Sequence, residues 1–197
     1  EARKIWGAIV NASRGWGITI KDYVTNRHAV QPLPESELFE LKTKFLNRHF
    51  AWLTALRFSL REKRNWEAIY KSHNTEYREK WFKVSEQNGD LQKELSAYLS
   101  PEELAVIMSK TNKAAQLLAL QSHHLRGLLE SGFIEDFRHM ELEKLLQEFY
   151  NQQGAAERIK NFPYPRQYAT VNLYFTKIFV YLLPLGMLQE FDKLGGN

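Results

Sequence analysis

The chain has 197 residues, of which 27 are Lys or Arg, 23 are Asp or Glu and none is Cys. The absence of cysteine excludes disulfides and thiolate metal sites, and a formal net charge of +4 is too small an excess to indicate nucleic-acid binding. The sequence begins at Glu1, inside a helical pattern and without a methionine, so we expect the chain to be a fragment.

Apolar residues at three-, four- and seven-residue spacings predict helices along most of the chain. The first runs over 2–23, and a proline-rich break separates it from a second over 36–61. Over 64–85, aromatic and charged residues alternate with less regularity, which predicts short helices and loops. We expect the basic residues of the second helix, Arg48 among them, to lie on faces other than the apolar one.

The clearest local signal is the segment Ser-Pro-Glu-Glu at 100–103. Serine can cap a helix, proline suits its first position, and Glu103 completes a capping box. This helix is predicted to run to a stop at Gly132, and another follows over 135–159. Because no strand pattern occurs, the predicted fold class is all-α, an elongated helical bundle.

A mostly apolar run covers 168–188, after a break that contains two prolines. As a helix it would reach roughly 30 Å at about 1.5 Å per residue, which matches the hydrocarbon core of a bilayer. Asn172, Thr176, Lys177 and Pro184 interrupt the run. Two interpretations therefore stay open, a membrane helix and a buried helix of a soluble bundle.

The sequence carries no catalytic signature. It has no phosphate-binding loop, no nucleophile-elbow motif and no His-Glu-x-x-His zinc motif. Its six histidines are predicted to lie at the surface or at an interface rather than to bind metal. We therefore predict that the protein is not an enzyme and has neither a cofactor nor a metal site.

Three segments, taken in order, resemble the bestrophin family. The opening Glu-Ala-Arg-Lys-Ile-Trp-Gly at 1–7 resembles the segment after the second membrane helix of bestrophins. The segment Asn-Arg-His-Phe-Ala-Trp-Leu-Thr-Ala-Leu-Arg at 47–57 resembles a cytosolic helix of the bacterial branch. The segment 157–169, which contains Asn-Phe-Pro-Tyr-Pro-Arg, resembles the entry into the third membrane helix.

The resemblance implies a subunit of a homopentameric channel that conducts small monovalent ions through an axial pore. Animal members pass chloride under calcium control, whereas bacterial members favour cations, so the selectivity of this chain stays open. The implied location is the inner cell membrane, with most of this chain on the cytoplasmic side. Residues 1–161 would be a cytosolic helical region, and 162–197 a proline break and an apolar, membrane-associated helix. The implied partners are copies of the chain, the lipid bilayer and small inorganic ions.

The resemblance also implies where a cytosolic pore constriction would lie, near the start of the helix after Gly132. Apolar side chains can narrow a pore and gate it by dewetting. The candidates are Ile134, Phe137, Met140 and Leu142. The alternative for each is that it packs inside its own bundle.

Basic residues flank the proline break, as expected on the cytoplasmic side of a membrane helix. They are Arg158, Lys160 and Arg166, and their alternative role is ordinary solvation of helix ends.

Two functions from different classes remain. In the channel, we expect contacts between subunits to bury parts of Phe45, Trp52 and Trp81. In a soluble helical interaction or scaffold module without transport, the run 168–188 would pack against the chain's own helices.

Overall fold

The computed structural model describes residues 1–64, 72–81, 84–162, 166–188, 190 and 193, and every regular element among them is a helix. The helices are α1 (Ala2–Tyr23), α2 (Glu35–Arg61), α3 (Ser72–Trp81), α4 (Ser85–Asn88), α5 (Leu91–Leu95), α6 (Pro101–Met108), α7 (Lys113–Glu130), α8 (Asp136–Asn161) and α9 (Arg166–Gly186). The prediction of an all-α fold is therefore confirmed.

The chain divides into two compact units, Glu1–Asn161 and Phe162–Asn197. The first holds α1 to α8, and the second holds α9. Their assignment to cytosol and membrane stays a prediction.

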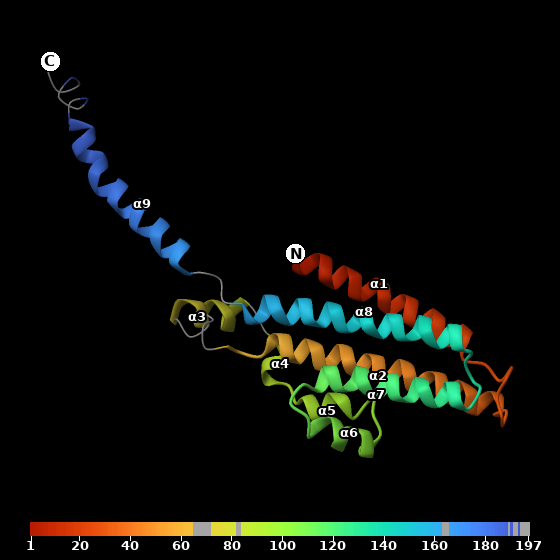
Figure 1. Cartoon of the computed structure of the whole chain (residues 1–197). Coiled ribbons are helices and arrows are strands. Elements are labelled where there is room, and N and C mark those ends of the chain that lie inside the picture. The colour runs from red at the N-terminus through yellow and green to blue at the C-terminus, as the bar shows by residue number, and fades with distance from the viewer. Residues whose placement is uncertain (65–71, 82–83, 163–165, 189, 191–192, 194–197) are drawn as a thin grey trace. The chain divides into compact units, whose positions relative to one another are not determined.

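Four long helices build the first unit (Figure 1). Helix α1 packs against α8, α2 packs against α7, and α7 also packs against α8. The short helices α4 and α5 pack on α2, and α6 packs on α7. Each long helix turns an apolar stripe inward, as Ile5, Ile9, Trp16 and Ile20 do from α1 at helical spacing.

Aromatic side chains fill the middle of this core. Trp16, Phe45, Trp52 and Phe149 are each at most 1% exposed, and the ring centroids of Trp52 and Phe149 lie 4.9 Å apart. The prediction that Phe45 and Trp52 contribute to a subunit interface is wrong, because their own bundle already buries them. Trp81 of α3 is exposed.

One predicted helix is two helices in the structure. Ser100 caps α6 as predicted, because its hydroxyl accepts a hydrogen bond from the backbone N–H of Glu103 (3.3 Å). The helix then ends at Met108, and α7 begins after Asn112, whose side chain accepts a bond from a backbone N–H one turn later (3.0 Å). The segment 109–112 is rich in residues whose side chains bond to nearby backbone and so favour caps over helix interiors.

The second unit consists mainly of α9, whose described side chains are all exposed in this chain. Among the residues that the structure describes, no helix combines the length and the apolar character that a bilayer crossing requires. Asn172, Thr176 and Lys177 interrupt the apolar sequence of α9. The predicted membrane helix is therefore not confirmed by the structure.

Candidate functional site

The four candidates for a pore constriction occupy two environments. Ile134 and Leu142 are 3% and 0% exposed and belong to the core of the first unit. Phe137 and Met140 are 83% and 55% exposed on the first turns of α8. Of the four, Phe137 and Met140 can therefore present apolar side chains to a pore while the bundle stays folded.

The turn before Phe137 is held against the loop that joins α1 to α2. Gly132 has a φ of 76°, and a Cβ atom at this position would lie 2.1 Å from the carbonyl oxygen of His28. The N–H of Thr25 donates a hydrogen bond to the carbonyl of Phe133 (2.9 Å). These contacts fix the backbone at the start of α8 and, with it, the places of the exposed apolar side chains.

Of the basic residues predicted at a membrane interface, Arg158 and Lys160 belong to the first unit and Arg166 belongs to the second. Arg158 is exposed and Lys160 is half-buried in the last turn of α8. Arg166 begins α9, but its side chain lies outside the described residues. Their contact with a membrane stays a prediction.

A buried arginine forms the centre of an ionic cluster in the bundle. Arg48 of α2 is 1% exposed, and its Nε donates a hydrogen bond to Glu103 Oε1 (3.1 Å). Its Nη2 donates to the same oxygen and lies 3.2 Å from His124 Nε2. The Nζ of Lys44 lies 3.6 Å from Glu103 Oε1. The prediction that Arg48 lies away from the core is wrong, because Glu103 of α6 and His124 of α7 supply the partners that burial requires.

The protonation states in this cluster follow from its geometry. Nδ1 of His124 lies 2.8 Å from the carbonyl of Leu120 and donates to it, which leaves Nε2 as an acceptor for Arg48. Burial lowers the pKa of His124, and the charge of Arg48 lowers it further. Burial opposes ionisation of Glu103, but the hydrogen bond and charge of Arg48 outweigh it and hold the pKa of Glu103 below its ordinary value. The cluster therefore contains a carboxylate, a guanidinium and a neutral imidazole.

A second histidine, His49, lies among aromatic rings in the core of its own bundle, and not at the surface or at an interface as predicted. It is 4% exposed, and its ring centroid lies 4.7 Å from that of Phe149 and 5.3 Å from that of Trp52. Its Nε2 lies 2.9 Å from Ser13 Oγ, whereas Nδ1 has no hydrogen-bond partner. Burial lowers the pKa of His49 to about 4.

We expect this histidine to make the stability of the bundle depend on pH. The unfolded chain takes up a proton near pH 6.5, whereas the folded protein resists protonation of His49 until about pH 4. The free energy of unfolding should therefore fall by about 3 kcal/mol as the pH drops through this window. Urea titrations at several pH values measure this slope.

The variant His49→Phe should flatten that slope, because it removes the titrating group and keeps an aromatic ring in its place. The hydroxyl of Ser13 keeps its own bond to the carbonyl of Ile9 (2.7 Å). Substitution of the exposed His123 by Gln is the matched control. An unchanged slope in His49→Phe would assign the pH dependence to other groups.

A chain of polar side chains leads from the core to the end of the bundle. Trp52 Nε1 donates a hydrogen bond to Gln153 Oε1 (2.9 Å), and Gln153 Nε2 donates to Glu157 Oε1 (2.8 Å). Asn112 Nδ2 donates to the same carboxylate oxygen (3.3 Å). Glu157 is thus oriented by two amide groups at the rim of a pocket.

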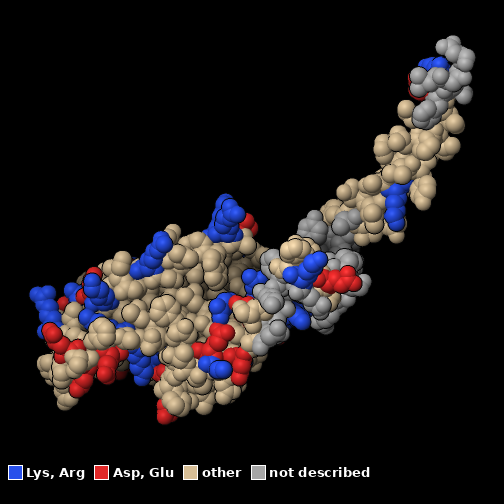
Figure 2. Space-filling model, turned by 180° about the vertical axis from the view of Figure 1, so that it is seen from behind, with Lys and Arg blue, Asp and Glu red and all other residues tan. Residues whose placement is uncertain are grey.

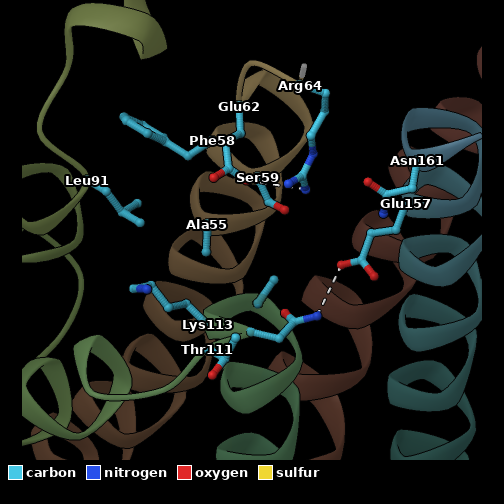
Figure 3. Close-up of a pocket in the computed structure, with 12 residues that line it drawn as sticks. Ala55, Phe58, Ser59, Glu62, Arg64, Leu91, Thr111, Lys113, Glu157 and Asn161 are labelled. Carbon is cyan, nitrogen blue, oxygen red and sulfur yellow. Dashed lines mark hydrogen bonds and ion pairs between the residues drawn. The ribbon is translucent and has the colours of Figure 1, made fainter. Parts of the chain in front are cut away.

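This pocket has a volume of about 530 Å³ and lies between the last turns of α2, the start of α5, the start of α7 and the last turns of α8 (Figure 3). Its lining residues are Ala55, Phe58, Ser59, Glu62, Arg64, Leu91, Thr111, Asn112, Lys113, Ala114, Glu157 and Asn161. The volume is in the range of small-molecule sites. In the part of the chain that the structure describes, no three His, Asp or Glu side chains are grouped so that they could hold a metal ion.

The outer face of α1 combines positive charge with apolar groups. Arg3, Arg14 and Lys21 are exposed, as are Trp6 and Ile18. Figure 2 shows Lys and Arg side chains spaced along the upper edge of the bundle, where α1 runs. Because α1 packs against α8, this basic face belongs to the same helix pair as Phe137.

In a comparison with protein families, residues 1–194 match the family described as "Bacterial/Fungal Bestrophin protein". The chain belongs to the bestrophin family. The resemblance seen in the three sequence segments is thereby confirmed. A comparison with curated proteins gives no match.

Solved structures of bestrophins have the same fold. A single-substitution variant of a bacterial bestrophin homologue from Klebsiella pneumoniae matches 95% of this chain with a TM-score of 0.69 and 18% identity, and a second such variant matches 97% with a TM-score of 0.70. A structure described as a membrane protein matches 96% of the chain at 19% identity, with a TM-score of 0.66. This bestrophin chain spans 56–57% of the length of those chains.

Sequence patterns missed several residues that organise the bestrophin bundle. Arg48 and His49 were predicted outside the core, although both lie inside the segment 47–57 that carries the family resemblance. No sequence pattern indicates that Lys113 and Glu157 line one pocket, because they lie more than forty positions apart and belong to different helices.

Proposed function

We propose that this bestrophin is a subunit of a homopentameric channel that conducts small monovalent ions through an axial pore. Membership of the family is the observation that carries the proposal. In this proposal the channel lies in the inner cell membrane, and most of this chain is on the cytoplasmic side.

The exposed start of α8 supports a constriction built from Phe137 and Met140. Phe137 and Met140 are three positions apart on one helix and together form a small exposed apolar patch, whereas a single exposed apolar side chain would be ordinary at a protein surface. Five copies of Phe137 around an axis would form an apolar ring that can exclude water when it narrows. Ile134 and Leu142 would support this ring from inside the bundle, because both are buried.

The basic face of α1 supports a path for ions beside this ring. Arg3, Arg14 and Lys21 give a positive potential along the helix that packs against α8. Charged walls raise the local concentration of counter-ions and influence which ions enter. The reversal potential under a salt gradient would give the sign of the conducted ion.

In this proposal Arg158, Lys160 and Arg166 lie near lipid headgroups, and α9 packs against lipid or neighbouring helices. The exposed apolar side chains of α9 support such a covered environment. Positive residues beside a membrane helix favour the cytoplasmic side.

The test is made on the full gene product, reconstituted in planar bilayers under a salt gradient. We expect a current whose reversal potential follows one ion. Phe137→Ala and Met140→Ala should each change the conductance by about twofold or more, because a smaller side chain widens an apolar constriction. Tyr150→Ala, also exposed but farther along α8, is the matched control and should leave the conductance unchanged.

A silent bilayer, with folded pentamer confirmed by native mass spectrometry, would reject the channel and favour the helical scaffold module. A current that none of the α8 variants alters would keep the channel and reject the constriction at Phe137 and Met140.

A further inference from the structure

The pocket at the end of the bundle holds two opposite charges that lack ionic partners among the described residues. The ammonium of Lys113 donates a hydrogen bond to the backbone carbonyl of Lys110 (3.2 Å). The carboxylate of Glu157 accepts from the amides of Gln153 and Asn112. The other two charged residues of the lining, Glu62 and Arg64, pair with each other (3.3 Å) and so neutralise one another.

Lys113 and Glu157 do not neutralise each other either. Figure 3 shows them on opposite sides of the pocket, Lys113 from α7 and Glu157 from α8. Both side chains are half-buried, so water screens them less than it screens a fully exposed pair. A ligand that joins the two sides would meet a positive group at one end and a negative group at the other.

The charge balance of the lining argues against a simple ion as the occupant. An anion near Lys113 would leave the carboxylate of Glu157 without a counter-charge, and a cation near Glu157 would leave the ammonium of Lys113 without one. A molecule that carries both charges satisfies both ends. Phe58 and Leu91 add apolar surface on the Lys113 side.

We propose that this pocket binds a small zwitterion with an apolar side chain, of the size of an amino acid or a dipeptide. The carboxylate of the ligand pairs with Lys113, and its ammonium pairs with Glu157 and the side-chain oxygen of Asn161. The apolar side chain packs on Phe58 and Leu91. This binding site goes beyond ion conduction, and it can be tested without recording any current.

The test is isothermal titration of the full chain with L-leucine and with the dipeptide glycyl-leucine, at low ionic strength. Two analogues probe the two ends: N-acetyl-leucine lacks the positive charge, and leucinamide lacks the negative one. We expect saturable binding of at least one zwitterion and a loss of about tenfold or more for each analogue, since one charged contact contributes about 1.4 kcal/mol or more.

The variants assign each end to its residue. In Lys113→Gln, leucine and leucinamide should bind equally, because the contact to the carboxylate is gone. In Glu157→Gln, leucine and N-acetyl-leucine should bind equally. Lys110→Gln removes the same charge three residues earlier, in the segment between α6 and α7 and outside the pocket lining, and should behave as the unmodified protein.

Circular dichroism verifies that each variant is folded, and the comparison of ligands within one variant does not depend on its stability. The proposal is overturned by the absence of saturable binding of both zwitterions to the unmodified protein. It is also overturned by analogues that bind as well as leucine, or by unchanged discrimination in Lys113→Gln.

Discussion

Glu103→Gln should lower the free energy of unfolding by about 3–5 kcal/mol, because it leaves the guanidinium of Arg48 buried without a negative partner. Arg48 is 1% exposed, and its hydrogen bonds go to Glu103 and to a neutral His124. An uncharged amide cannot replace the carboxylate, and the nearby Lys44 adds repulsion. Urea unfolding followed by the helical circular dichroism signal measures the loss.

The neighbouring residue provides the matched control. Glu102 has the same charge in the same helical turn but is fully exposed, so Glu102→Gln should leave stability nearly unchanged. The double variant Arg48→Met/Glu103→Leu removes both charges and should recover much of the lost stability, since apolar groups can replace a buried ion pair. Equal effects of Glu102→Gln and Glu103→Gln would contradict the buried cluster.

Gly132→Ala should be the second severe substitution, with a loss of about 3 kcal/mol or more. The residue has a φ of 76°, a conformation that costs roughly 1–2 kcal/mol for a residue with a Cβ atom. The added methyl would also lie 2.1 Å from the His28 carbonyl oxygen, so the loop between α1 and α2 must move. The same urea titration measures this loss.

Gly127→Ala is the control for that substitution. Gly127 lies inside α7, and a Cβ atom there meets nothing within 4 Å. Alanine is the better helix former, so Gly127→Ala should stabilise the protein by about 0.5–1 kcal/mol. If Gly132→Ala and Gly127→Ala changed the free energy of unfolding in the same direction, the close contact at Gly132 would not hold the turn.

The helices could be predicted from sequence where local chemistry decides them. The apolar spacing of α1 and α2 gave their extents to within one residue, and the Ser100 cap fixed the start of α6. The break at 109–112 escaped prediction because the apolar residues on its two sides keep a helical spacing, as Ile107 and Ala114 do, although the side chains of the break favour a cap.

The environments of the charged residues could not be predicted in the same way. A helical stripe shows which side of α2 is apolar, but Arg48 is buried because Glu103 meets it from 55 positions away. The constriction candidates show the same limit. Phe137 and Leu142 are both large apolar residues near the start of one helix, so sequence patterns do not distinguish them. Only the packing of α8 on its neighbours shows that the side chain of Phe137 is exposed and that of Leu142 is buried.

The pairing of α1 with α8 has a consequence for biosynthesis. The ribosome completes α1 first, yet the helix that covers its apolar stripe follows about a hundred residues later. At a synthesis rate of about 5–20 residues per second, the apolar stripe of α1 stays uncovered for roughly 5–20 seconds, until α8 has been synthesised. During this time Ile5, Ile9, Trp16 and Ile20 are open to chaperones and to other nascent chains. A stalled or truncated product that ends before α8 would therefore expose an aggregation-prone helix, which makes the last helix of the bundle the one that completes its folding.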